Sequence, residues 1–332
     1  MTSFPAPASL AWVPMRRLAT VLAALAALAV LAACSGDDGP RVAAGGASST
    51  STTTTIAATS TTVAPATSPS TATTSTPATT RPSTTGPAPA GVTTLAEGDP
   101  GSVAIAIAAS EAAIRDPGTP VSDLERHGRA QQVAYRQLAA HPDWLAEVLD
   151  KVPPSLHATV RANVSAGTEL RALTKPQPAL PPWNIVAPAP AGELLGYYKA
   201  AEASLSVPWN YLAAIHLVET RMGRIRGTST AGAQGPMQFL PATWNQYGEG
   251  GDINSNRDAI LAAARYLARN GAPADLGRAL FAYNRSQRYV NAVTAYAQQM
   301  GADERAYHGY YHWQVYYRLA DGDRLLPVGY SG

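Results

Sequence analysis

Apolar residues are unevenly distributed along the 332 residues of the chain. An uncharged apolar run covers residues 18–33, and residues 35–98 contain almost no large apolar side chain. From residue 101 onward apolar residues recur at helical spacing, except in a Pro-rich connector. The pattern divides the chain into a leader (1–33), a Ser/Thr/Pro-rich tether (34–100), a helical region (101–174), the connector (175–190) and a C-terminal domain (191–332).

The helical region is predicted from three apolar segments, at residues 103–114, 124–138 and 144–149. The last of them follows a break at His141-Pro142. We find no catalytic constellation in this region and interpret it as an accessory region that packs on the C-terminal domain. Two interpretations stay open, namely a pure scaffold and a region that also helps to hold the ligand.

The C-terminal domain is predicted to be mainly α. A nearly continuous apolar stretch before Glu219 predicts a buried helix, with Pro208 in its first turn and Ser206 as its cap. Further helices are predicted at residues 257–270, 276–283 and 289–300. No repeat is visible outside the low-complexity tether.

Glu219 is the candidate catalytic residue. Leu212, Ile215, Glu219 and Met222 are spaced by three, four and three residues, so the carboxyl group lies on the apolar stripe of the helix. An apolar lining disfavours the charged form, so we expect the pKa of Glu219 to be raised. A proton retained near neutral pH suits a general acid for glycosidic cleavage. The alternative is a structural Glu that forms an ion pair with Arg221 or Arg224.

Three blocks around Glu219 resemble the soluble lytic transglycosylase family and its relatives, which share the lysozyme-like fold. The first block is Glu219-Thr220, and the third is Ala282-Tyr283-Asn284. The second block is Ser229-Thr230-Ala231-Gly232-Ala233-Gln234-Gly235-Pro236-Met237-Gln238. Residues 218–224 are similar to the membrane-bound B-type branch. Thr220 replaces a usual Ser and Pro236 a usual aliphatic residue, and neither change removes a reactive group.

The resemblance implies cleavage of the β-1,4 bond between N-acetylmuramic acid and N-acetylglucosamine in peptidoglycan. The sugar's own N-acetyl group would act as nucleophile, and Glu219 would serve first as acid and then as base, giving a 1,6-anhydro product. Tyr283 would orient Glu219 through its hydroxyl group. Ser229, Met237 and Gln238 would line the cleft around the sugar, and Asn284 would help hold the geometry of the site.

Two alternatives remain beside this function. Goose-type lysozymes share the fold and the single Glu, so a hydrolytic muramidase is the alternative among enzymes. A non-catalytic peptidoglycan-binding lipoprotein is the alternative outside them.

The N-terminal pattern is typical of a secretory signal. Arg16-Arg17 precede the apolar run, which ends in Leu31-Ala32-Ala33-Cys34. This ending resembles the cleavage box of bacterial lipoproteins, so Cys34 is the expected lipidation site. A spanning anchor is the alternative, but the run has 16 residues, fewer than the roughly 20 that a transmembrane helix needs. We therefore expect an extracytoplasmic protein that is lipid-anchored to the outer face of the cytoplasmic membrane.

The tether contains too few apolar residues to offset the entropy of ordering, and its composition is typical of a solvated stalk. Cys34 is the only Cys of the chain, so a mature protein would have no disulfide and no thiol nucleophile. The expected partners are peptidoglycan glycan strands and, through Cys34, the membrane. Cell-wall synthesis proteins are further candidate partners.

The remaining motifs favour structural roles. His308 and His312 are four residues apart but lie among aromatic residues, which favours packing or sugar stacking over metal binding. Residues 252–258 alternate Asp and Asn like a calcium loop but lack its Gly and distal Glu, which favours a turn at a helix start. We predict no metal site and no cofactor. A net charge of +2 gives no support for nucleic-acid binding.

Overall fold

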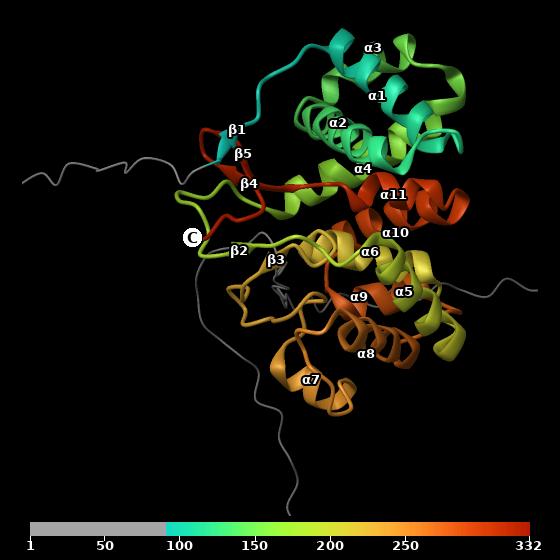
Figure 1. Ribbon diagram of the computed structural model, residues 1–332, viewed down its shortest axis with the longest axis vertical. Coiled ribbons are helices and arrows are strands. Elements are labelled where there is room, and N and C mark those ends of the chain that lie inside the picture. The colour runs from blue at the N-terminus through green and yellow to red at the C-terminus, as the bar shows by residue number, and fades with distance from the viewer. Residues whose placement is uncertain (1–90) are drawn as a thin grey trace, which may run out of the picture. The chain divides into compact units, whose positions relative to one another are not determined.

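The computed structural model describes residues 91–332, shown in colour in Figure 1. The predicted leader, Cys34 and the tether up to residue 90 lie outside the described residues. The described chain is mainly α-helical, as expected. Within it, no helix combines the length and apolar character that a membrane crossing requires.

The first helices correspond to the helical region predicted at residues 101–174. Asp99 begins the first of them as a capping box, since Ser102 N donates to Asp99 Oδ1 at 2.9 Å and Asp99 N donates to Ser102 Oγ at 3.2 Å. The elements of this region are α1 (Pro100–Arg115), α2 (Val121–Ala140), a 3-10 turn (Pro142–Trp144), α3 (Leu145–Lys151), a second 3-10 turn (Pro154–Leu156) and α4 (His157–Leu173).

Three of the later helices were predicted with bounds, and these follow the prediction closely. The predicted helix at 276–283 has the same bounds in the structure, and those at 257–270 and 289–300 differ by one or two residues at their ends. The helices are α5 (Ala191–Leu205), α6 (Trp209–Thr220), α7 (Pro241–Tyr247), α8 (Asn256–Arg269), α9 (Leu276–Tyr283), α10 (Gln287–Ala302) and α11 (Arg305–Tyr311).

The prediction that Ser206 caps the helix before Glu219 is wrong. Ser206 ends α5 in the left-handed conformation, with φ 56°, and its N–H donates to Glu202 O. Pro208 takes the N-cap position of α6, and no side chain hydrogen bond caps this helix. The two helices are so close in sequence that one polar residue between them fits either boundary.

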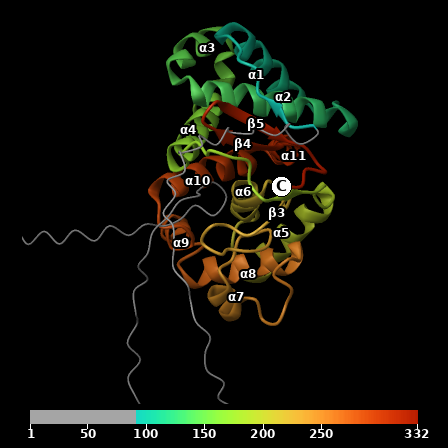
Figure 2. The same cartoon turned by 90° about the vertical axis from the view of Figure 1, so that its left-hand side faces the viewer.

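The two helical regions share one hydrophobic core. Both views show α10 and α11 between α1–α4 on one side and α5, α7, α8 and α9 on the other (Figures 1 and 2). In this arrangement α10 packs against both α4 and α6, and α11 packs against α2. Ion pairs reinforce the contact, since Arg288 contacts Glu169 at 2.6 Å and Arg115 contacts Asp303 at 2.9 Å.

A small sheet joins the two ends of the described chain. The aromatic stretch near the C-terminus forms the hairpin of β4 (Val315–Leu319) and β5 (Gly322–Leu326), which the sequence analysis did not predict. The strand β1 (Thr93–Thr94) adds to β5, with Thr93 opposite Leu325. These last residues of the predicted tether are therefore paired with the C-terminal hairpin. A separate pair joins β2 (Asn184–Ile185) to β3 (Ile225–Arg226).

Asp323 fixes the hairpin to the N-terminal helices. Its Oδ2 accepts hydrogen bonds from Arg136 on α2 at 2.5 Å and from Arg171 on α4 at 2.9 Å. Burial alone would raise the pKa of Asp323, but the two arginines outweigh it and hold the pKa below its usual value. Asp323 is therefore a buried anion that is stable only with these partners.

Candidate active site

The helix α6 carries Glu219 at its end. Every residue from Leu212 to Thr220 is buried, and Ile215 and Met222 are fully inaccessible, as the predicted stripe requires. A helix that is apolar around its whole circumference must be surrounded by protein. Glu219 therefore enters the interior from the last turn of a central helix.

The chain turns sharply after Glu219. Arg221 and Met222 both have positive φ, at 53° and 60°, which ends the helix. Thr220 holds this turn, since its Oγ1 accepts from Gly223 N at 3.0 Å and donates to Pro236 O at 2.6 Å. The hydroxyl group of Thr220 thus links the end of α6 to the second motif block.

Glu219 is 3% exposed and accepts one hydrogen bond, from the hydroxyl group of Tyr289 to its Oε1 at 2.8 Å. Burial raises the pKa of Glu219 to about 7, and the hydrogen bond from Tyr289 opposes the rise. The direction agrees with the sequence prediction. A carboxyl group with this pKa is partly protonated at neutral pH and can act as acid and as base.

The ion-pair alternative for Glu219 does not hold. Arg221 donates from Nη1 to Leu217 O at 2.5 Å, and Arg224 donates from Nη1 to Arg221 O at 3.1 Å. Both guanidinium groups therefore bond to backbone carbonyls at the end of α6. Glu219 has no ion pair within residues 91–332.

The contact expected of Tyr283 belongs to Tyr289 instead. The hydroxyl group of Tyr283 donates to Met237 O at 2.6 Å. The two tyrosine rings are stacked, with centroids 6.5 Å apart and planes 4° from parallel. Tyr283 therefore holds the second motif block beside Tyr289, while Tyr289 holds the carboxyl group. Tyr289 lies outside the three motif blocks. The sequence feature that could have indicated it is its place on a predicted helix, because the hydroxyl group of a buried tyrosine needs a hydrogen-bond partner.

The second motif block forms a tight loop after the turn that ends α6. Ser229 Oγ accepts from Ala233 N at 2.9 Å, and Gln238 Nε2 donates to Gly235 O at 2.9 Å. Gly235 has φ +73°, and a Cβ atom on it would lie 1.9 Å from Ile253 O. Only Gly fits this position.

The structure thus connects three of the predicted site residues, through the unpredicted Tyr289, by hydrogen bonds and stacking. Glu219, Tyr289, Tyr283 and the backbone of Met237 follow one another across the site, and the Met237 side chain is fully buried. Asn284 caps the end of α9, and its buried Oδ1 has no hydrogen-bond partner among the described residues. The sugar contacts expected of Ser229, Met237, Gln238, Tyr283 and Asn284 stay predictions.

A pocket of about 150 Å³ lies beside this loop. It is lined by Ile225, Arg226, Gly227, Thr228, Gln234, Gly235 and Asn254. Residues from the turn after α6 and from the second motif block therefore face the same space.

The other motifs have structural contacts. Ser255 caps α8, Asp252 N donates to Asp258 Oδ2 at 3.1 Å, and Asn254 N donates to Asp252 Oδ1 at 2.9 Å, which is the helix-start turn favoured by the sequence. Burial lowers the pKa of His308, and it lowers that of His312 to about 4, so burial favours the neutral form of both rings. Within residues 91–332 no cluster of three His, Cys, Asp or Glu side chains suits a metal ion.

Comparison with known families assigns the region around this site. Residues 196–306 match the family model of the transglycosylase SLT domain. The matched range contains Glu219, Tyr283 and Tyr289, and it supports a peptidoglycan-cleaving function of transglycosylase type. The lysozyme-like fold expected from the three motif blocks is thereby confirmed. Neither the curated proteins nor the solved structures give a match to the chain.

Proposed function

We propose that this protein is a lytic transglycosylase that cleaves the β-1,4 bond between N-acetylmuramic acid and N-acetylglucosamine in peptidoglycan. The observation that carries the proposal is the state of Glu219, a buried carboxyl group within the SLT domain whose pKa is raised to about 7. Burial and Tyr289 are the two causes of this pKa, so no charged group of the described residues acts on the carboxyl.

The first step uses Glu219 as an acid. Its carboxyl proton passes to the glycosidic oxygen as the bond from that oxygen to C1 of the muramic sugar breaks. The N-acetyl oxygen of the same sugar attacks C1, and a positively charged oxazolinium ring forms. The substrate supplies this nucleophile, so the mechanism needs one protein carboxyl group instead of the usual two.

The second step uses the same carboxylate as a base. It takes the proton of the sugar's 6-hydroxyl group while the oxygen of that group attacks C1 and displaces the N-acetyl oxygen. The product is a 1,6-anhydro sugar, no water is consumed, and Glu219 regains its proton. The hydrogen bond from Tyr289 keeps one carboxyl oxygen in a fixed direction through both steps.

Digestion of purified peptidoglycan tests both the residue and the product. We expect muropeptides that end in 1,6-anhydro-N-acetylmuramic acid, lighter by one water than hydrolysed ones, in mass spectrometry. Glu219→Gln should reduce their formation by about 10²- to 10⁴-fold, the usual contribution of general acid-base catalysis. Glu202→Gln on α5 makes the same chemical change away from the site and should retain activity.

Two outcomes would contradict the proposal. Reducing ends alone would identify a hydrolytic muramidase. A folded Glu219→Gln protein with more than a small fraction of wild-type activity would remove Glu219 from the reaction.

We also propose that the enzyme is a lipoprotein anchored through Cys34 to the outer face of the cytoplasmic membrane. The support is the sequence Leu31-Ala32-Ala33-Cys34 after a basic and apolar leader. Cys34→Ala should move the protein from the membrane pellet to the soluble extracytoplasmic fraction in cell fractionation, because one acyl-bearing residue supplies the anchor. A Cys34→Ala protein that stays in the pellet after a high-salt wash would indicate a spanning segment.

A further inference from the structure

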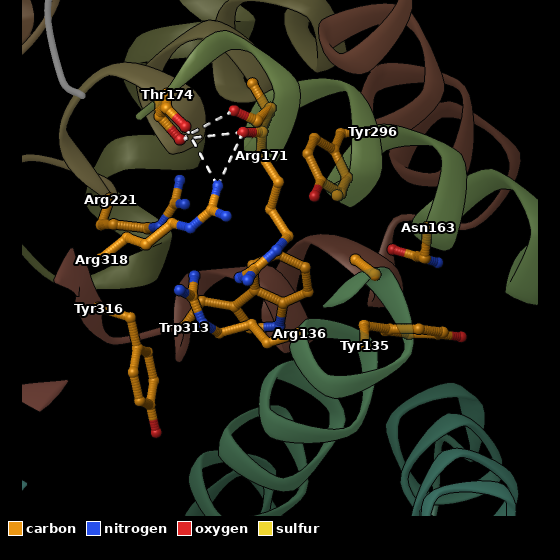
Figure 3. A pocket seen from close by; sticks show the side chains of 13 residues that line it. Tyr135, Arg136, Asn163, Arg171, Thr174, Arg221, Tyr296, Trp313, Tyr316 and Arg318 are labelled. Atoms are coloured by element: carbon orange, nitrogen blue, oxygen red, sulfur yellow. Dashed lines mark hydrogen bonds between the residues drawn. The ribbon is translucent and has the colours of Figure 1, made fainter. Parts of the chain in front are cut away.

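A cavity of about 60 Å³ lies where the N-terminal helices, the end of α6 and the C-terminal hairpin meet (Figure 3). Four arginines, from three elements and the turn after α6, line it, and no carboxylate is among its lining residues. They are Arg136 on α2, Arg171 on α4, Arg221 directly after α6, and Arg318 on β4. Glu219 does not line this cavity.

The four guanidinium groups have one carboxylate partner among the described residues. Arg136 and Arg171 share Asp323 Oδ2. Arg318 donates from Nη1 to the backbone carbonyls of Arg171 and Thr174, at 3.1 Å each, as the dashed lines in Figure 3 mark. Arg221 donates to Leu217 O. The cavity wall therefore has a large excess of positive charge.

Part of this charge is poorly solvated, although the side chains of Arg136 and Arg171 are 18% and 25% exposed. Arg221 is 9% exposed, and Arg136 Nε is buried without a hydrogen-bond partner among the described residues. Burial lowers the pKa of Arg221 to about 10, with Tyr296 opposing the change and the charges of Arg136 and Arg224 adding to it. Burial likewise lowers the pKa of Arg318, and the charges of Arg171 and Arg136 add to the effect. Buried cations without counter-ions are costly unless an anion joins them.

We propose that this cavity binds a small oxyanion, with phosphate as the class of ligand that fits it best. Guanidinium groups present paired N–H donors that match the oxygens of phosphate and carboxylate. A space of about 60 Å³ holds a few water molecules or one such ion and is too small for a sugar ring. A doubly charged ion also neutralises more of the excess charge than a single carboxylate does.

The bound ion would add a connection between parts of the fold that are distant in the sequence. Its oxygens would contact α2, α4 and β4 together with Arg221, two residues after Glu219. Occupancy should therefore stabilise the junction between the two helical regions and the end of α6. A ligand that binds only the folded state raises the melting temperature in proportion to the logarithm of its concentration.

Calorimetric titration of the full-length protein with inorganic phosphate, at constant ionic strength and without any glycan, tests this inference. We expect saturable binding and a melting temperature that rises with phosphate but not with chloride. Arg318→Gln should weaken phosphate binding about tenfold or more, the ratio expected when a charge-assisted hydrogen bond is lost. Arg161→Gln, the same charge change on the exposed surface of α4, should leave binding unchanged.

Two further arms keep the test decisive. Arg221→Lys retains the charge but loses the paired N–H donors of the guanidinium group, so it should also weaken phosphate binding. This variant replaces Arg318→Gln if circular dichroism shows that the Arg318→Gln protein does not fold. Glycerol phosphate distinguishes a free ion from a phosphate group on a larger molecule, and saturable binding of either one supports the site. Absence of saturable phosphate binding, or equal binding by Arg318→Gln and Arg161→Gln, would overturn the proposal whatever the glycan product is.

Discussion

The protonation of Glu219 results from a competition between its burial and one hydrogen bond. Burial favours the neutral carboxyl group, whereas the hydroxyl group of Tyr289 favours the carboxylate. A general acid must be protonated, so activity should fall as the pH rises through the pKa of Glu219, near 7. The pH at which activity falls on this alkaline limb of the profile therefore measures the balance between burial and the hydrogen bond.

Tyr289→Phe should shift the limb to higher pH. The change removes the group that stabilises the carboxylate, so the pKa of Glu219 rises further and the protonated form persists longer. We also expect turnover at the optimum to fall about tenfold or more, because the carboxyl loses its fixed direction. The measurement is the dependence of kcat on pH with purified peptidoglycan.

Tyr283→Phe is the matched control for this shift. It removes a hydroxyl group from the neighbouring stacked ring, whose hydrogen bond goes to Met237 O instead of to Glu219. We expect the variant to lower kcat, because the loop that carries Met237 loses this hydrogen bond. The pH at which activity falls on the alkaline side should stay unchanged. An equal shift in both variants would mean that Tyr289 does not act through its hydrogen bond to the carboxyl.

At this scale the sequence located Glu219 because helix spacing and the apolar stretch around it are local properties. It did not locate Tyr289, which is 70 positions further along the chain. The choice between Tyr283 and Tyr289 depends on how α9 and α10 meet at the end of α6, and no local spacing encodes that geometry.

The loop after α6 depends on the space that its neighbour leaves. Gly235→Ala places a Cβ atom at 1.9 Å from Ile253 O, in addition to the cost of a positive φ. Gly232→Ala, with φ +83° and no atom within 4 Å of the added Cβ, shows the conformational cost alone. We expect Gly232→Ala to lower the free energy of unfolding by about 1 to 2 kcal/mol.

In Gly235→Ala the clash should lower the free energy of unfolding by about 1 to 3 kcal/mol more, because Ile253 O is a backbone atom that cannot rotate away from the added Cβ. Urea unfolding of both variants measures the difference, and equal destabilisation would contradict the steric argument. Activity should fall only in Gly235→Ala, because the clash displaces the loop whose Met237 O accepts the hydrogen bond from Tyr283.

Among whole elements, the sequence predicted α8, α9 and α10 to within two residues because their apolar spacing is regular. The hairpin of β4 and β5 was missed, although Val315, Tyr316 and Tyr317 are residues that favour strands. The two tyrosines were interpreted as packing or sugar-stacking residues, and the pairing with β1 is a contact between opposite ends of the described chain. Ser206 illustrates the limit at boundaries, since α5 and α6 are separated by three residues.

At the scale of the molecule, the shared core makes the N-terminal helices part of the catalytic fold. The faces of α10 and α11 that pack on α4 and α2 are buried in the structure. We expect a chain that starts at residue 191 to keep helical content but to lose cooperative melting, since these apolar faces would be exposed. A chain that starts at residue 91 should melt in one transition and remain active.

Circular dichroism and calorimetry of the two shortened chains check this expectation. A cooperative, active protein that starts at residue 191 would show that the helical region is dispensable for folding. The sequence could not decide this point, because a helix that packs on a separate scaffold and one that completes a core have the same apolar pattern.

The pairing of β1 with β5 also determines how the folded part carries mechanical load. A pull applied to the chain at residue 91 reaches Thr93 and Thr94 before it reaches α1, and so passes into the hairpin. Leu95 N bonds to Asp323 O at 2.9 Å, and the side chain of Asp323 transfers the force to α2 and α4 through its two arginines. Tension along the N-terminal segment is therefore borne by β5 and the N-terminal helices, and α6 with Glu219 lies outside the load path.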